Sequence, residues 1–287
     1  MEIRVFVPGQ VSCVQALLER EYTGYPYPVE CRAEYISYVA TDGDDVIGFA
    51  RAKRDQSFTR AHVYEFGTAI VDPNRRVRGT MRALAARITN EGWGRGAEFQ
   101  HTEMVTFVPG IQKVLPAVGF QFCGLELAKH PCLRDMPQPE SVFFAVARPD
   151  GVIRRRGPVF LPPDYQVLVT AYLPSFLAAG SDEALVEAAP TPHYHAPYER
   201  DGVRGSEFID VAVNWPEAID LLQDLRAHGW CFSGVLPGLL QTTTGRPCDG
   251  IRLQRLPQGL SFDPALVQAI DPIAAVLKRH VITHLLS

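Results

Sequence analysis

Along the first 150 residues, stretches with the hydrophobic spacing of a helix alternate with apolar runs typical of strands. This pattern predicts a domain of mixed strands and helices. Val11, Val14, Leu17 and Leu18 recur at the spacing of one helix face, so we expect a helix over 8–22. Apolar runs bounded by Gly, Pro, Asn and Asp predict strands. We expect an opening strand ending at 7, strands over 36–41, 45–53, 61–71, 97–107, 120–128 and 141–148, and further helices over 79–91 and 109–117.

Proline and basic residues concentrate between 149 and 163, which predicts a boundary between two domains. This stretch holds Pro149, Pro158, Pro162 and Pro163 together with three consecutive arginines. We therefore expect a first domain over 1–150 and a second over 151–287. The second is predicted to contain a helix over 165–179, an irregular stretch over 180–206 and a C-terminal helix.

The second domain repeats a pattern found in the first. Gly96-Ala-Glu-Phe99 is echoed by Gly205-Ser-Glu-Phe208, and 119–124 (GFQFCG) is echoed by 229–234 (GWCFSG). Each copy reads as strand, helix, Gly-aromatic strand and final strand, which predicts a duplicated half-domain. Two unrelated strand–helix–strand units are the alternative.

Composition narrows the classes of partner and compartment. The chain has 287 residues and a formal net charge of −4, so it offers no overall basic field for nucleic acid or an anionic membrane surface. No signal peptide and no apolar run of membrane-spanning length is evident, so we expect a cytoplasmic protein. The six cysteines include no C-x-x-C pair and no His at metal-ligand spacing, which predicts reduced thiols that mostly fill the core, and no metal. They are Cys13, Cys31, Cys123, Cys132, Cys231 and Cys248.

The sharpest local signal is a strand, an arginine-rich turn and a helix start over 64–84. Arg75, Arg76, Arg78 and Arg82 surround Gly79 at the predicted entrance of the helix. The first N–H groups of a helix lack internal partners and carry positive partial charge, so cations there oppose the helix dipole. Such a cluster favours a bound anion, with Gly79 leaving room for a phosphate. A solvated basic helix start is the alternative.

This segment resembles the pyrophosphate loop of the GNAT superfamily of acyl-CoA-dependent N-acyltransferases, which reads Q/R-x-x-G-x-G/A. Arg76-Val-Arg-Gly79-Thr-Met81 fits that loop, except that Met81 replaces the final small residue. The resemblance implies an α/β (α+β) fold with a mixed, mostly antiparallel sheet flanked by helices, and acetyl-CoA or another acyl-CoA as co-substrate. It also implies two sets of cofactor-binding residues. The pyrophosphate would lie against Arg76, Val77, Arg78, Gly79, Thr80 and Met81, and the pantetheine arm against the backbone of Ala69, Ile70 and Val71.

The resemblance extends over roughly residues 1–150. The second family motif, a strand, a helix and a Gly-Phe strand, corresponds to 98–120. A bacterial branch of the superfamily is similar in Tyr25-Pro-Tyr-Pro28, Gln112-Lys113 and Leu161-Pro-Pro163, and it too has a C-terminal extension with a Gly-aromatic repeat. The second, smaller domain would then be half a GNAT-like α/β unit.

Acyl transfer to an amine requires a group that removes a proton from the ammonium. Glu65 lies on the strand leading to the predicted cradle, where family members often place a general base; a sheet-surface carboxylate or a partner of an arginine is the alternative. On the next strand His101 and Glu103 share one face. They are candidates for a base and its orienting partner, and an exposed sheet edge explains them nearly as well.

Two positions depart from the family pattern. Leu115 stands where the family usually has a tyrosine general acid, and Val108 stands where it has an asparagine. Tyr25 or Tyr27 would substitute as the acid if their loop folded over the site. Cys123 as a covalent nucleophile and a metal site at 193–195 (HYH) are weak alternatives.

The sequence thus favours an N-acyltransferase that moves an acetyl or short acyl group directly to the amine of a small metabolite. The second domain would shape the acceptor pocket or pair subunits into a homodimer. One alternative is a catalytically degenerate GNAT-like protein that binds acyl-CoA or acts as a scaffold. Another is a transferase that uses longer chains or carrier-protein thioesters.

Overall fold

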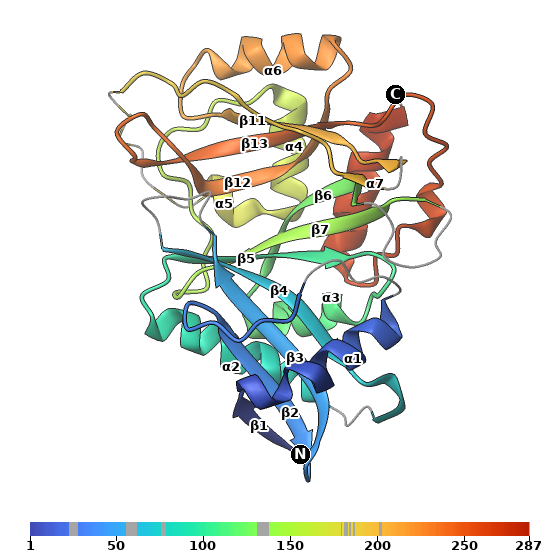
Figure 1. Cartoon of the computed structure of the whole chain (residues 1–287). Helices are drawn as coiled ribbons and strands as arrows, with labels where there is room; N and C mark the ends of the chain where they lie inside the picture. The colour runs from blue at the N-terminus through green and yellow to red at the C-terminus, as the bar shows by residue number, and fades with distance from the viewer. Residues whose placement is uncertain are drawn as a thin grey trace.

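One twisted sheet runs through the whole molecule, with helices on both of its faces (Figure 1). The chain is described from a computed structural model. The structure describes residues 1–22, 28–55, 62–75, 79–130, 138–178, 180, 183, 185, 187–200 and 203–286.

The main sheet has the strand order β1-β2-β3-β4-β5-β7-β6-β12-β13-β11-β8. Among the named strands only β4 and β5 pair in parallel, so the sheet is mixed and mostly antiparallel, as predicted. A separate hairpin consists of β9 and β10. The strands are β1 (Glu2–Val5), β2 (Ile36–Asp42), β3 (Asp45–Arg54), β4 (Val63–Val71), β5 (Phe99–Val105), β6 (Gln121–His130), β7 (Glu140–Ala147), β8 (His193–His195), β9 (Glu199–Arg200), β10 (Val203–Arg204), β11 (Glu207–Ala212), β12 (Cys231–Gln241) and β13 (Pro247–Arg255).

Helices cover the two faces of the sheet because each buries an apolar stripe. Helix α2 buries Leu84, Ala85 and Ile88 in the main core, whereas α1 packs Val14 and Leu18 with residues of the opposite face. Helices α4 and α7 pack together, and α7 also contacts β6 and β12. The helices are α1 (Val11–Glu21), α2 (Thr80–Gly94), α3 (Ile111–Val114), α4 (Pro163–Tyr172), α5 (Pro174–Ala178), α6 (Ala218–Ala227) and α7 (Pro272–Leu286), with short 3-10 turns at Pro8–Gln10, Pro73–Arg75, Pro116–Val118 and Pro264–Leu266.

The two predicted repeats meet at the pairing of β6 with β12. Outward from this junction the order is β6, β7, β5 on one side and β12, β13, β11 on the other. Gly124 and Gly234 are direct partners there, and they hold the same position in the two repeated sequences. A methyl carbon at Gly234 would lie 2.5 Å from Cα of Gly124 and 2.6 Å from the carbonyl oxygen of Cys123. The arrangement is the one a duplicated unit would produce, while the common origin and the boundary at 150 stay predictions.

Side chains complete the junction where the backbone ladder is short. The Ser233 hydroxyl donates to the carbonyl of Leu125 (3.0 Å), and the Ser206 hydroxyl donates to the carbonyl of Leu127 (2.6 Å). The Leu127 N–H donates to the side-chain oxygen of Gln254 (2.7 Å). Buried backbone groups need such partners, so these side chains fix the second half of the sheet to the first.

Proline corrects three of the expected helices. The first begins at Val11 because Pro8–Gln10 forms a 3-10 turn. The helix expected over 109–117 divides before Pro116, and the one expected over 165–179 begins at Pro163 and divides before Pro174. A proline within a helix lacks an N–H and its ring meets the preceding turn. The stretch expected to be irregular, 180–206, contains β8, β9 and β10.

Candidate active site

Strands β4 and β5 form a fork near the middle of the first half. They pair from Val63 with Phe99 to Phe66 with Thr102, and no pairing between them continues beyond that point. Strand β4 goes on to Val71, still paired with β3, and β5 goes on to Val105, still paired with β7. Figure 1 shows the two strands together at one end and apart at the other. The facing backbone edge of β4 past Phe66 therefore lacks a strand partner among the described residues.

Two threonines shape the fork. The Thr102 hydroxyl donates to the Phe66 carbonyl at 2.9 Å, which closes the last step before the strands diverge. Strand β4 bulges at Thr68, because Ala50 pairs with Ala69 while Arg51 pairs with Gly67. A bulge bends its strand and increases the local twist, so it turns the end of β4 away from β5.

Helix α2 follows β4 and begins at the open side of this region. Its N-cap, Gly79, has φ +91°, in the left-handed region that favours glycine. No side chain caps the helix start, and a methyl carbon at Gly79 would meet nothing within 4 Å. Gly79 is exposed at this entrance, whereas Thr80 next to it is buried with its hydroxyl 3.0 Å from the Met1 sulfur, and the first N–H groups of a helix suit an anion. The backbone conformation is a second reason for glycine at this position, beyond the room for a phosphate inferred from the sequence.

Of the two described arginines in the predicted cluster, Arg75 is engaged by carboxylates of this chain. Arg75 donates to Asp42 (3.0 Å) and to Asp45 (2.6 Å) at the turn between β2 and β3, so it neutralises two carboxylates instead of a ligand. Arg82 is exposed on the first turn of α2. The predicted binding residues Arg76, Val77 and Arg78 lie outside the described part of the chain.

The side chains of the other predicted cofactor-binding residues are buried or half-buried. Ile70 is 5% exposed in the cluster beneath α1, and Ala69 and Val71 pack on the main core. Thr80 is buried and Met81 is half-buried at the start of α2. Their backbone groups at the fork and at the helix start remain the part that would contact an acyl-CoA.

The predicted catalytic residues share one face, as the strand period indicated. Glu65 pairs with His101 across β4 and β5, and laterally paired residues point to the same side. Lys53 binds Glu65 at 2.9 Å, and the Glu65 side chain is 27% exposed. His101 is 6% exposed, and its Nε2 lies 2.9 Å from a carboxylate oxygen of Asp55.

The structure gives His101 and Glu103 different hydrogen-bond partners, so these contacts do not join them as base and orienting partner. Glu103 instead accepts from Lys129 (2.5 Å) and contacts Nε2 of His130 (2.8 Å). Burial acts to raise the pKa of Glu103, but the charge of Lys129 and the contact with His130 outweigh it and hold that pKa well below its ordinary value. Glu103 is thus a stable carboxylate and a poor proton acceptor, while the carboxylate beside His101 is that of Asp55.

Glu103 begins a chain of ion pairs that crosses into the second half. Lys129 binds Glu126 as well as Glu103, and Glu126 accepts from Arg252 at 2.6 Å. Arg252 also donates twice to Asp210, both at 2.7 Å. Asp210 in turn lies 2.6 Å from His195. Each carboxylate has a cationic or imidazole partner, as buried charges require.

A cavity of about 560 Å³ lies over these ion pairs and is lined by residues of both halves. Asp55, His101 and Glu103 come from the first half, and Asp210 and Arg252 from the second. Cavities of this size commonly hold small ligands.

Sequence reasoning missed the partners that fix these groups. Asp55 and His101 are 46 positions apart, and no local pattern indicates that the end of β3 meets β5. Lys129 and Glu126 lie on a strand whose pairing with β7 is irregular between Glu126 and His130, which period-2 reasoning does not anticipate. Leu115 is fully buried, so it fills the core where the family has a tyrosine. Tyr25 and Tyr27 lie outside the described residues.

The remaining chemical candidates have structural explanations. Burial raises the pKa of Cys123 to about 12, so it is an unreactive thiol. Cys13 and Cys31 are exposed, which corrects the expectation that the cysteines mostly fill the core. His195 belongs to β8 and binds Asp210. In the described ranges no three His, Cys, Asp or Glu side chains are grouped as metal ligands, and no helix there has the length and apolar character to cross a membrane.

The fork lies within the part of the chain that matches a known family model. Residues 12–105 match the family model described as the acetyltransferase (GNAT) family. No curated protein sequence matches the chain. Among solved structures, the ribosomal-protein-alanine N-acetyltransferase from Brucella melitensis aligns at 16% identity over 52% of this chain and 99% of its own, with a TM-score of 0.44. The aminoglycoside 6'-N-acetyltransferase from Enterococcus faecium aligns at 15% identity over 52% of this chain and 97% of its own, with a TM-score of 0.40.

Proposed function

We propose that this chain, whose residues 12–105 match the acetyltransferase (GNAT) family model, transfers an acetyl group from acetyl-CoA to the amine of a small metabolite. The observation that carries the proposal is the fork of β4 and β5 beside a helix that starts at an uncapped, left-handed glycine. The backbone of 69–71 would pair with the pantetheine arm. The helix entrance at Gly79 would accept the pyrophosphate, since several N–H donors are directed at one anion there.

The acceptor amine would lie in the cavity above His101 and Glu103. This cavity is lined by His101, the cross-strand partner of Glu65, and partly by Asp210 and Arg252 of the second half. On this proposal the second half shapes the acceptor pocket. The enclosed volume and the buried charges suit a small polar amine.

His101 is the group that we assign as general base. An amine must lose a proton before it attacks the thioester carbon, and imidazole is well suited to accept protons near neutral pH. Asp55 would hold the ring in position at 2.9 Å. The ammonium first gives one proton to His101, which passes it to solvent. As the new C–N bond forms and the C–S bond breaks, the second proton on nitrogen passes to neutral His101 and the departing thiolate takes a proton from solvent. Glu65, held by Lys53, is the alternative base.

Product formation tests the proposal against a protein that only binds acyl-CoA. The purified full chain is incubated with acetyl-CoA and a panel of primary amines, and free CoA thiol and acetylated amine are both quantified. We expect amine-dependent release of thiol in equal amount to product. Saturable acetyl-CoA binding with no product across the panel would support the scaffold alternative. A clear preference for octanoyl-CoA over acetyl-CoA would replace the acetyl assignment with the longer-chain one.

A pair of substitutions decides which group is the base. His101→Gln should lower kcat about a hundredfold, because general base catalysis contributes that much or more, and should leave acetyl-CoA affinity nearly unchanged. Glu65→Gln, the matched control on the neighbouring strand, should lower kcat only a few fold. The opposite ranking of the two kcat values would move the base to Glu65.

A further inference from the structure

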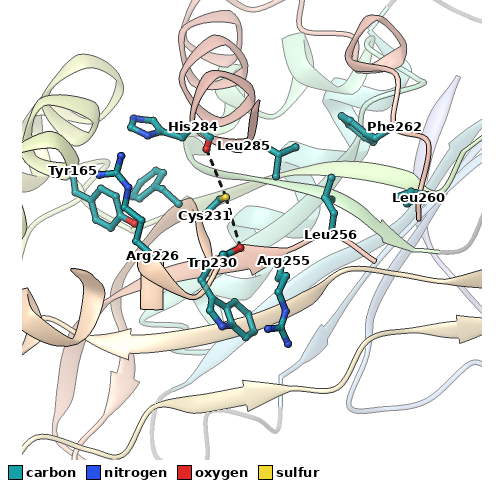
Figure 2. A pocket seen from close by; sticks show the side chains of 12 residues that line it. Tyr165, Arg226, Trp230, Cys231, Arg255, Leu256, Leu260, Phe262, His284 and Leu285 are labelled. Carbon is teal, nitrogen blue, oxygen red and sulfur yellow. Dashed lines mark hydrogen bonds between the residues drawn. The ribbon is translucent and has the colours of Figure 1, made fainter. Parts of the chain in front are cut away.

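A second cavity, of about 670 Å³, lies in the second half of the molecule and shares no lining residue with the first. Its walls come from α4, α6, α7, the start of β12, the end of β13 and the segment 256–262 that follows β13. Figure 2 shows that the side chains are divided by polarity. Tyr165, Arg226 and His284 gather at one end, and Leu256, Leu260, Phe262 and Leu285 gather at the other.

The polar end contains a buried hydroxyl that lacks a partner. Tyr165 is 2% exposed, and no described atom hydrogen-bonds to its hydroxyl. Its ring is held by Phe232, at 5.3 Å between centroids. Burial raises the pKa of Tyr165, so the hydroxyl stays protonated and can donate. Because buried polar groups are nearly always satisfied, this hydroxyl indicates an acceptor that is supplied from outside the chain.

Two arginines line the cavity, and each is paired with a carboxylate outside the lining. Arg226 and Arg255 are the cationic members of the lining, which includes none of the described Asp or Glu residues. Arg226 binds Asp164 through one nitrogen, but a guanidinium has five N–H donors, so a second carboxylate can be bound beside the first. Arg255 is occupied by Glu207 and lies over the Trp230 ring, so we assign the anion to Arg226.

We propose that this cavity binds a monocarboxylate with an apolar tail, of the class of a medium-chain fatty acid. The carboxylate accepts hydrogen bonds from the Tyr165 hydroxyl and from Arg226. The tail lies between Leu256, Phe262 and Leu285. The division of the lining into one cationic, donor-rich end and one apolar end matches an amphipathic anion and neither a sugar nor a free phosphate.

The test uses decanoate and the intact chain in isothermal titration calorimetry. We expect saturable binding at one site that persists in the presence of saturating acetyl-CoA, since the two cavities are separate. Decanol, which keeps the tail and loses the charge, should bind at least about tenfold more weakly. Equal binding of decanol, competition by acetyl-CoA, or no saturable binding of decanoate would each overturn the proposal.

Two tyrosines on α4 supply a matched pair of variants. Tyr165→Phe removes only the unpartnered hydroxyl, so we expect an unchanged or higher Tm without ligand and about tenfold weaker decanoate binding. Tyr172→Phe removes a hydroxyl that donates to the Cys123 carbonyl at 3.1 Å, so it should lower Tm and leave decanoate affinity unchanged. Decanoate affinity in Tyr165→Phe equal to that of the unmodified protein would show that the hydroxyl does not bind the ligand.

Discussion

The two halves of the sheet differ most in what lies beyond their corresponding strands, β5 and β11. Beyond β5 lies β4, which runs parallel, pairs up to Phe66 and then diverges. Beyond β11 lies β8, which runs antiparallel over only His193–His195. In the first arrangement, the edge of β4 past Phe66 has no strand partner among the described residues and lies near a helix start. In the second, the short strand β8 pairs with the outer edge of β11.

The difference separates the two features on which the proposed acyl-CoA site depends from the part of the fold that repeats. A parallel pair needs a crossover connection, and here that connection is α2, whose uncapped entrance begins at Gly79. Antiparallel β8 brings no such helix. In the described part of the second half, therefore, the strand order repeats but the fork and the anion-binding helix start do not, so we expect one acyl-CoA per chain.

A series of ion pairs connects β5, which borders the fork, with β11 in the second half. It runs from Glu103 on β5 through Lys129 and Arg252 to Asp210 on β11. Burial alone would lower the pKa of Lys129, but the carboxylates of Glu103 and Glu126 outweigh it and raise that pKa. Lys129 therefore stays protonated and neutralises the carboxylates of Glu103 and Glu126.

Removing that charge should give the largest effect. Lys129→Met leaves Glu103 and Glu126 without their ammonium, and breaking a buried pair costs about 3–5 kcal/mol. Urea unfolding at pH 7 measures the loss. Arg95→Met, which removes the cation of an exposed pair with Glu91, is the control and should cost under about 1 kcal/mol. Similar losses for the two variants would mean that the chain of ion pairs does not hold the halves together.

Acid should weaken the same connection in the unmodified protein. The pKa of Glu103 and the pKa of Asp210 are both lowered in the folded state: burial acts to raise them, but Lys129 and Arg252 outweigh it. A depressed folded pKa adds stability that is present above the unfolded value and is lost as pH falls towards the folded one. The urea midpoint should therefore drop as pH falls from about 5, and drop less in Lys129→Met. A midpoint independent of pH between 7 and 4 would contradict this.

The junction between the halves should be the next most sensitive point. Gly234→Ala places a methyl carbon 2.5 Å from Cα of Gly124, and backbone atoms cannot move aside as a side chain can. We expect a loss of about 3 kcal/mol, at the upper end for overpacking. Gly110→Ala, at a helical φ of −55° with open space around it, is the control and should be neutral. Thermal unfolding compares the two variants, and an unaltered Tm in Gly234→Ala would mean that the strands can separate there without cost.

The sequence predicted local chemistry better than it predicted long-range contacts. Gly79 and the repeated glycines at 124 and 234 were visible because the reasons for them lie in a turn and in a recurring motif. The partnership of Asp55 with His101, and that of Glu103 with Lys129, depends on how distant strands are ordered in the sheet. Arg75 shows how a distant contact changes a local prediction. Its position in the sequence suggested an anion site, but the turn between β2 and β3 supplies two carboxylates that pair with it. The divergence of β4 from β5 likewise follows from a bulge at Thr68, which no residue pattern announced.

The substitution with the smallest expected effect on stability, Gly79→Val, is the most direct test of the fork. Gly79→Val forces a β-branched residue into a φ of +91° and narrows the helix entrance, so acetyl-CoA affinity should fall about thirtyfold, or roughly 2 kcal/mol, the value of one hydrogen bond to a charged group. Gly96→Val is the matched control, because Gly96 has φ +81° and open space just past the other end of α2. Both variants carry similar backbone strain, so both should lower Tm by a similar amount. Calorimetric titration with acetyl-CoA separates them: if Gly96→Val weakened binding as much as Gly79→Val, strain in α2 and not the helix entrance would explain the loss.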